Sequence, residues 1–250
     1  MSGHSHWARI KRAKGVTDAR RGRAWSKLAR GIIIAARQGG GDPDSNLSLR
    51  YAIDAARDAN MPKDTIERAI KKGTGELAGT TYEELLFEAY GPGGVAILCA
   101  VLTDNRNRTA PEIKRIFENH NGRIGGANSV ARLFKKRGVF LVAADKADED
   151  TLTNLALETG ADDVRSLGDA FELTCDPGVF GRVREALETA GIKPESAEIT
   201  MVATTTVNLQ GAEAERMMRL IDALEEHDDV QEVHSNFDIS GEDAARFSKE

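Results

Sequence analysis

The stretch from VFLVAA, residues 139–144, to SAEITMVA, residues 196–203, decides the fold because strand patterns alternate in it with helical ones. Between these two end strands the sequence predicts a helix at 148–159, a strand near Val164, the strand AFELTC at 170–175 and a helix at 178–190. The order β-α-β-β-α-β over roughly 65 residues is typical of the ferredoxin-like fold. We therefore predict an inserted ferredoxin-like α/β domain at residues 135–203.

The segments on either side of this stretch each supply part of a second sheet. Before it, the sequence predicts the strands LLFEAYG (85–91) and GVAILCAVLT (94–103) around a GPGG turn, a helix at about 110–120 and a short strand near Val130 to Phe134. After it come a strand at 204–210, a helix at 212–226 and a strand at 229–239. The β-α-β segment after the insertion cannot complete a sheet alone and is expected to pair with the strands before it. We therefore predict one discontinuous ferredoxin-like α/β domain, 80–134 plus 204–240. Residues 241–250 form a polar tail.

Residues 1–79 read as a basic helical domain. The first helix is predicted to begin at Thr17 or Asp18 and to end at Gly39 to Gly41, the second spans about 47–59, and the third begins at Pro62 and ends before Gly73. In the first helix, one face is apolar and the opposite face carries cations: Arg20, Arg23, Lys27, Arg30 and Arg37. The whole chain is therefore predicted to be an α+β multidomain protein, with three helices followed by two ferredoxin-like α/β domains.

Charge divides the chain into two unlike parts. The net charge is −6, but residues 1–75 hold 16 Lys and Arg against 7 Asp and Glu, a net of +9, which leaves −15 on the remaining 175 residues. A basic end on an acidic body is typical of a protein in which one module contacts a polyanion. A solvated basic bundle without a partner is the alternative.

Most of the candidate nucleic-acid contacts lie in the first thirty residues. Trp7 could stack on a base or anchor the arm, and cations can replace the counterions of a phosphate backbone. The cations of this region are Arg9, Lys11, Arg12, Lys14, Arg20, Arg21, Arg23, Lys27 and Arg30, and the third helix ends with Lys71 and Lys72.

The segment TDNRNRT, residues 103–109, is a second candidate contact. Thr109 and Glu112 have the spacing of a capping box, which predicts that a helix begins there. Arg106 and Arg108 then stand at a strand end and a helix N-terminus, where guanidinium groups can bind phosphate or base edges. A solvated turn held by salt bridges to Asp104 is the other interpretation, and the two stay open.

Other chemistries find little support in the sequence. Cys99 and Cys175 stand in apolar runs and are predicted to be core residues. His4 and His6 lack the spacing and partners of a metal site, although a processed amino terminus followed by His4 could bind copper or nickel. The longest apolar run, 95–102, is too short to span a membrane. We predict a cytoplasmic protein that is not an enzyme and has no cofactor and no metal.

Several motifs occur in the order found in one known family. GHSHWARIK (3–11), NMPKDTIERAIKKG (60–73), FEAYGPGG (87–94) and TDNRNRT (103–109) resemble the YebC/PmpR family, and the likeness continues more loosely to NFDI (236–239). The resemblance implies three domains and a probable transcriptional regulator that binds DNA. It also implies, as alternatives, translational activation in a mitochondrial branch or a ribosome-associated factor that binds ribosomal RNA and relieves stalling at proline-rich stretches. A protein-interaction module without nucleic-acid binding is the competing class.

Overall fold

The computed structural model describes residues 18–78 and 81–239, except for the side chains of residues 18–21 and 23. Within the described residues the first three helices are α2 (Asp18–Gly39), α3 (Leu47–Asp58) and α4 (Lys63–Thr74), close to the predicted bounds. They bury one apolar cluster that includes Ile32, Leu49 and Ile66. Asn46 caps α3, since its side chain accepts a hydrogen bond from the Leu49 N–H. None of the helices in the described residues is long and apolar enough to cross a membrane.

Helix α4 crosses α2 at a glycine. A Cβ added at Gly73 would lie 2.5 Å from the Ile33 carbonyl oxygen and 2.6 Å from the Ala36 Cβ. Gly73→Ala is therefore expected to lower the free energy of unfolding by about 1 to 2 kcal/mol, because backbone has to move to admit the methyl group. Urea unfolding measures this loss. The matched control is Gly31→Ala on α2, where an added Cβ meets nothing within 4 Å; alanine there is expected to stabilise the helix by about 0.5 kcal/mol. Equal effects at the two sites would contradict the prediction.

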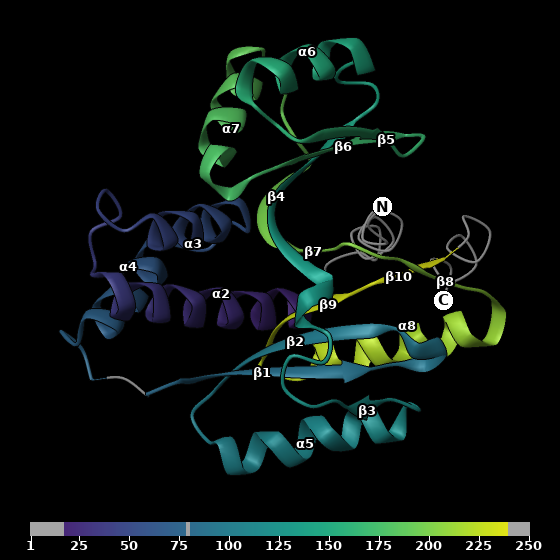
Figure 1. Ribbon diagram of the computed structural model, residues 1–250. Coiled ribbons are helices and arrows are strands. Elements are labelled where there is room, and N and C mark those ends of the chain that lie inside the picture. Colours follow the sequence, from purple (N-terminus) through teal and green to yellow (C-terminus); the bar gives the residue numbers. More distant parts are fainter. Residues whose placement is uncertain (1–17, 79–80, 240–250) are drawn as a thin grey trace.

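The inserted unit has the predicted ferredoxin-like topology. Its sheet has the order β5-β6-β4-β7, and all three neighbouring pairs are antiparallel. Helices α6 and α7 lie on the same face of the sheet (Figure 1) and share its apolar core, which includes Phe140, Leu173 and Val183. The elements are β4 (Phe134–Ala143), α6 (Glu149–Thr159), β5 (Asp163–Ser166), β6 (Ala170–Cys175), the 3-10 turn η3 (Pro177–Val179), α7 (Phe180–Thr189) and β7 (Ser196–Ala203).

The other four-stranded sheet combines segments from both sides of the inserted unit. Its order is β3-β1-β2-β9, so β9 from the end of the chain pairs with β2. Helices α5 and α8 cover one face and bury residues such as Phe117 and Met217. The elements are β1 (Glu83–Tyr90), the 3-10 turn η1 (Pro92–Gly94), β2 (Ala96–Thr103), α5 (Arg106–Asn119), β3 (Arg123–Ile124), α8 (Gly211–Glu226) and β9 (Val230–Ser235). The α+β class and the order of the units are confirmed, while the exact domain boundaries stay a prediction.

The short strand predicted near Val130 to Phe134 was wrong. That segment holds the 3-10 turn η2 (Ala131–Leu133) and the first residue of β4, and the edge strand of this sheet is β3 instead. The cause is Glu88 on β1, whose carboxylate accepts the N–H groups of Val130 at 2.7 Å and Ala131 at 2.8 Å. These N–H groups are therefore used by a side chain and not by a strand partner.

The predicted strand at 229–239 is divided into two strands. Asn236 separates β9 from β10 (Phe237–Ile239), and its side-chain oxygen accepts the Ala96 N–H at 2.7 Å. Strand β8 (Val207–Leu209) pairs in parallel with β10 in a separate two-stranded sheet. Of the described strands that follow the inserted unit, β9 is therefore the one that joins the sheet β3-β1-β2-β9.

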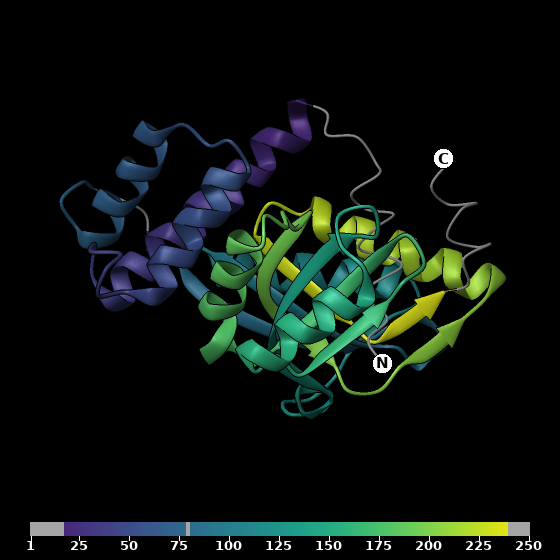
Figure 2. The ribbon, with the colours of Figure 1, turned by 90° about the horizontal axis from the view of Figure 1, so that it is seen from above.

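The helical unit lies to one side of the two sheet units, as Figure 2 shows. It contacts the inserted unit through Tyr51, whose ring meets Phe180 edge-on at 5.3 Å between centroids. Arg184 on α7 forms an ion pair with Asp54 at 3.3 Å. The two sheets also share a small apolar cluster that includes Leu98 and Phe134. The helical unit is thus packed against the rest of the chain and does not stand apart from it.

Both cysteines are core residues, as predicted. Cys99 and Cys175 have no exposed surface, and neither forms a disulfide. Burial raises the pKa of the Cys99 thiol to about 12 and that of Cys175 to about 11. Both side chains are therefore thiols at neutral pH and are poor nucleophiles.

Candidate nucleic-acid interface

The described residues include only part of the basic surface predicted from the sequence. His4, His6, Trp7, Arg9, Lys11, Arg12 and Lys14 lie outside the described residues, as does the possible helix cap Thr17. Arg20, Arg21 and Arg23 lie on α2, but their side chains are not described. The structure thus places the side chains of Lys27, Arg30, Lys71, Lys72, Arg106 and Arg108.

Lys27 and Arg30 bind the carbonyl end of another helix. The Lys27 ammonium donates a hydrogen bond of 2.7 Å to the carbonyl oxygen of Glu225, in the last turn of α8. The Arg30 guanidinium donates to the Asp228 carbonyl oxygen just beyond that helix. Carbonyl groups at a helix C-terminus lack partners within the helix and carry partial negative charge, so they favour cations. The cationic face of α2 is therefore in part an internal contact surface.

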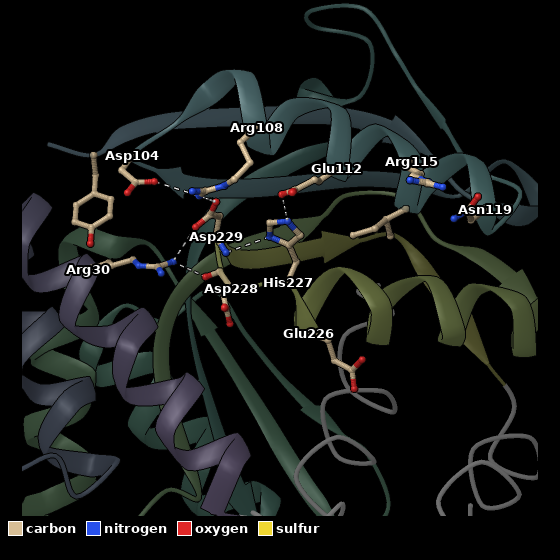
Figure 3. Close-up of a pocket in the computed structure, with 12 residues that line it drawn as sticks. Arg30, Asp104, Arg108, Glu112, Arg115, Asn119, Glu226, His227, Asp228 and Asp229 are labelled. Atoms are coloured by element: carbon tan, nitrogen blue, oxygen red, sulfur yellow. Dashed lines mark hydrogen bonds and ion pairs between the residues drawn. The ribbon is translucent and has the colours of Figure 1, made fainter. Parts of the chain in front are cut away.

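Asp229 is the centre of a polar network that joins three parts of the chain (Figure 3). The residue is 5% exposed. One carboxylate oxygen lies 2.7 Å from Arg108, 2.6 Å from the Thr109 hydroxyl and 3.1 Å from the Thr103 hydroxyl. The other oxygen lies 3.4 Å from Arg30 on α2. One carboxylate thus connects the helical unit, the β2–α5 segment and the start of β9.

The network lowers the pKa of the Asp229 carboxyl group. Burial by itself would raise the pKa, because it disfavours the charged form. Hydrogen bonds from Thr109, Arg108 and Thr103, together with the charge of Arg108, more than offset burial and hold the pKa below its ordinary value of 3.8. Asp229 is therefore ionised at neutral pH and can balance both arginines.

The capping box predicted at Thr109 and Glu112 was wrong. Helix α5 begins at Arg106, and its cap is Asn105, whose side chain accepts the Arg108 N–H at 3.1 Å. Thr109 is buried inside the helix and turns its hydroxyl to Asp229. Asn105 and Thr109 are both residue types that cap helices, so the sequence does not distinguish between them. In the folded protein the Thr109 hydroxyl binds Asp229 instead, and Asn105 is the cap.

The predicted cations fall into different environments. Arg108 is half-exposed and forms ion pairs with Asp104 at 3.1 Å and with Asp229. The predicted salt bridge to Asp104 is therefore present, with Asp229 as a second partner. Arg106 is exposed in the first turn of α5. Lys71 and Lys72 are exposed in the last turn of α4. The structure brings Arg30 and Arg108 together on one carboxylate, while the two lysines belong to a helix outside that network.

A pocket of about 640 Å³ opens beside the Asp229 network. Cations and carboxylates both line it, and several lining side chains already have partners, such as His227, which is hydrogen-bonded to Glu112 at 3.1 Å. Figure 3 shows His227 and Glu112 in direct contact with each other at this pocket. No sequence pattern predicted that Asp229, His227 and Glu112 line one site. The one sequence signal that could have pointed to Asp229 is its position, since it is an acidic residue between the end of a helical pattern and an apolar strand pattern.

Comparison with known proteins agrees with this architecture. Residues 5–76 match the TACO1/YebC protein N-terminal domain, and residues 82–237 match the TACO1/YebC second and third domain. A probable transcriptional regulatory protein of Pelotomaculum thermopropionicum is 54% identical over 241 residues, which is 96% of this chain and 99% of that protein. A protein of the same description from Citrifermentans bemidjiense is 52% identical over 247 residues, 99% of this chain and 100% of that protein.

A solved structure shows the same fold. The crystal structure of a conserved hypothetical protein from Aquifex aeolicus superimposes with a TM-score of 0.83 at 45% identity. The superposition covers 94% of this chain and 98% of the Aquifex chain. The likeness therefore extends through the helical unit and both sheets. With both domain descriptions and full-length relatives in agreement, the chain belongs to the TACO1/YebC family.

Proposed function

We propose that this chain is a cytoplasmic, non-enzymatic regulator of gene expression that binds DNA. The observation that carries the proposal is the net charge of +9 on residues 1–75 against −15 on the remainder. Cations grouped in one module are the usual footprint of phosphate binding. The names of the relatives, which are probable transcriptional regulatory proteins, support a regulatory role.

The contact surface we propose consists of the basic arm, the exposed part of the α2 cations and the helix ends that carry Lys71, Lys72 and Arg106. The sequence of α4 holds few polar side chains suited to reading base edges, so the binding is expected to be to the phosphate backbone. Lys27, Arg30 and Arg108 reach nucleic acid only if they exchange the carbonyl and carboxylate partners described above. Trp7, Arg9, Lys11, Arg12, Lys14, Arg20, Arg21 and Arg23 remain part of the proposed surface.

Ribosomal RNA is the second candidate partner. The observation in its favour is the acidic body, because a charge of −15 outside the first 75 residues repels a polyanion that surrounds the protein. A structured RNA approached from one side meets the basic module and avoids the acidic remainder. A protein-interaction role without nucleic acid is the third class, and the experiments below separate all three.

Removal of Lys71 and Lys72 is expected to weaken binding to nucleic acid. In the double variant Lys71→Ala/Lys72→Ala, we expect about tenfold lower affinity at low salt, and a plot of log affinity against log salt that is shallower by about 1 to 2. Fluorescence anisotropy with a duplex DNA and with a ribosomal RNA fragment measures both quantities. The matched control is Lys146→Ala/Lys193→Ala, two exposed cations on the inserted unit, which is expected to bind as the wild type does.

Sedimentation of cell extracts through a sucrose gradient then distinguishes the partners. Migration with ribosomal subunits that is lost at high salt favours the RNA candidate. Retention at the top of the gradient, with tight salt-sensitive binding to duplex DNA, favours DNA. Absence of salt-sensitive binding to either nucleic acid would overturn the proposal and leave the protein-interaction class.

A further inference from the structure

The segment from residue 119 to residue 144 is basic within an otherwise acidic body. It holds five cations and no Asp or Glu, although residues 76–250 as a whole carry −15. The cations are Arg123, Arg132, Lys135, Lys136 and Arg137. The sequence patterns that predict the fold do not require this charge, and the basic helical unit does not include it.

Four of these five cations are exposed. Arg137 is half-buried and forms ion pairs with Asp162 and Asp176, each at 3.5 Å, so the inserted unit uses it internally. By contrast, within the described residues no carboxylate lies within 4.0 Å of the other four cations. Arg123 instead lies over the Tyr90 ring, 5.1 Å from its centroid. The four exposed cations are Arg123, Arg132, Lys135 and Lys136. They follow one another along the chain from β3 to the start of β4, and we call these four residues the β3–β4 basic patch.

Buried hydrogen bonds hold the backbone that carries the patch. The Glu88 carboxylate accepts three N–H groups of the segment, those of Asn128 at 2.6 Å, Val130 and Ala131. The Tyr90 hydroxyl donates to the Ser129 carbonyl oxygen at 3.2 Å. Because Arg123 stacks on that same ring, its guanidinium group lies beside the loop that leads to Arg132.

Hydrogen bonds and packing also hold the start of β4. The Leu133 carbonyl oxygen accepts both the N–H and the hydroxyl group of Thr204, at 2.8 and 3.1 Å. Phe134 is buried in the cluster that the two sheets share. Figure 1 shows the chain passing from β3 into the long strand β4 at this point. The cations of the patch are thus fixed at their backbones, which reduces the ordering entropy that a bound partner has to offset.

We propose that the β3–β4 basic patch is a second contact for the phosphodiester backbone of nucleic acid, distinct from the basic helical unit. The inference rests on the proposed function, because it assumes that the same nucleic acid also contacts residues 1–75. Exposed Arg and Lys without carboxylate partners bind phosphate by replacing counterions. Two contacts on one molecule raise the overall affinity, since the second forms at a high effective concentration once the first is made.

The test is the triple variant Arg132→Ala/Lys135→Ala/Lys136→Ala in the full chain. Anisotropy titrations with a duplex DNA and with a ribosomal RNA fragment are expected to show at least tenfold weaker binding to the partner nucleic acid. The slope of log affinity against log salt is expected to be smaller by about 2 to 3. The control Lys114→Ala/Lys146→Ala/Lys193→Ala removes the same charge at exposed positions elsewhere and is expected to reduce affinity less than twofold.

A charge-preserving variant guards against loss of the fold. Arg132→Lys/Lys135→Arg/Lys136→Arg is expected to bind within about twofold of the wild type, because backbone contacts depend on charge more than on side-chain shape. If the wild type binds with strong salt dependence but the alanine triple variant keeps both affinity and slope, the patch is not a contact, while the proposed function stands. If the wild type binds neither nucleic acid, both inferences are overturned.

Discussion

Asp229→Ala is expected to lower the free energy of unfolding by about 3 kcal/mol, because it removes the shared partner of several buried polar groups. The substitution removes the carboxylate that accepts from the Thr103 and Thr109 hydroxyls. These two residues have no exposed surface, and the acceptors that remain to their hydroxyls in the described part of the chain are each other and the Asn105 carbonyl oxygen. It also removes the carboxylate that lies between Arg30 and Arg108. Urea unfolding at neutral pH, followed by ellipticity, measures the loss.

Acid titration gives this prediction a second readout. The folded-state pKa of Asp229 lies below its ordinary value of 3.8, so its contribution to stability is complete above that value and is lost as the pH falls through the folded-state pKa. The difference between wild type and variant is therefore expected to be constant near neutral pH and to decrease below about pH 3.8.

Asp228→Ala is the control for Asp229. Its side chain is exposed, and it contributes to the network through its backbone carbonyl oxygen, which alanine retains. We expect a change within about 0.5 kcal/mol. A loss at Asp229 no larger than that at Asp228 would show that the network does not stabilise the contact between the helical unit and the rest of the chain.

Glu88→Gln is expected to lower the free energy of unfolding by about 2 kcal/mol. The carboxylate accepts three backbone N–H groups with both of its oxygens, and such charge-assisted hydrogen bonds are stronger than neutral ones. Glutamine has one acceptor oxygen, and its amide N–H₂ group would face at least one of these donors. Hydrogen exchange at residues 128–131 is expected to become faster in the variant, because the loop loses its anchor.

The pH dependence of Glu88 has the same sign as that of Asp229. Burial raises the pKa of its carboxyl group, but hydrogen bonds from the Val130, Ala131 and Asn128 N–H groups more than offset burial and hold the pKa below the ordinary value of 4.5. The stability that Glu88 contributes is therefore lost as the pH falls through the folded-state pKa, and the difference from the variant decreases in acid. Glu83→Gln on the same strand, where the side chain is exposed, is expected to have no effect of this size.

Hydrophobic periodicity was sufficient to predict most elements. The three N-terminal helices and the inserted β-α-β-β-α-β unit follow from patterns that repeat within one element, and each such element buries its own apolar face. Both strand errors lie where a side chain binds the backbone of a distant segment. Glu88 prevents a strand at residues 130–131, and Asn236 divides the strand predicted at 229–239.

Some properties of the candidate interface likewise follow from the sequence, and others depend on the fold. The number and position of the cations in residues 1–75 are properties of the sequence, and they alone support polyanion binding. Which cations are already bound within the protein is a property of the fold. Lys27 and Arg30 have the same periodicity on α2 as Arg37, yet they meet the carbonyl end of α8.

The fold class, the order of the units and the charge difference between the two ends of the chain follow from the sequence alone. These depend on composition and on spacing within a few helical turns or strand residues. By contrast, the contacts of Asp229 with Arg30 and Arg108, and those of Glu88 with the segment that carries the β3–β4 basic patch, are properties of the tertiary fold. The physical reason is that a buried carboxylate has to be surrounded by hydrogen-bond donors. In this fold the donors come from residues that are far apart in the sequence.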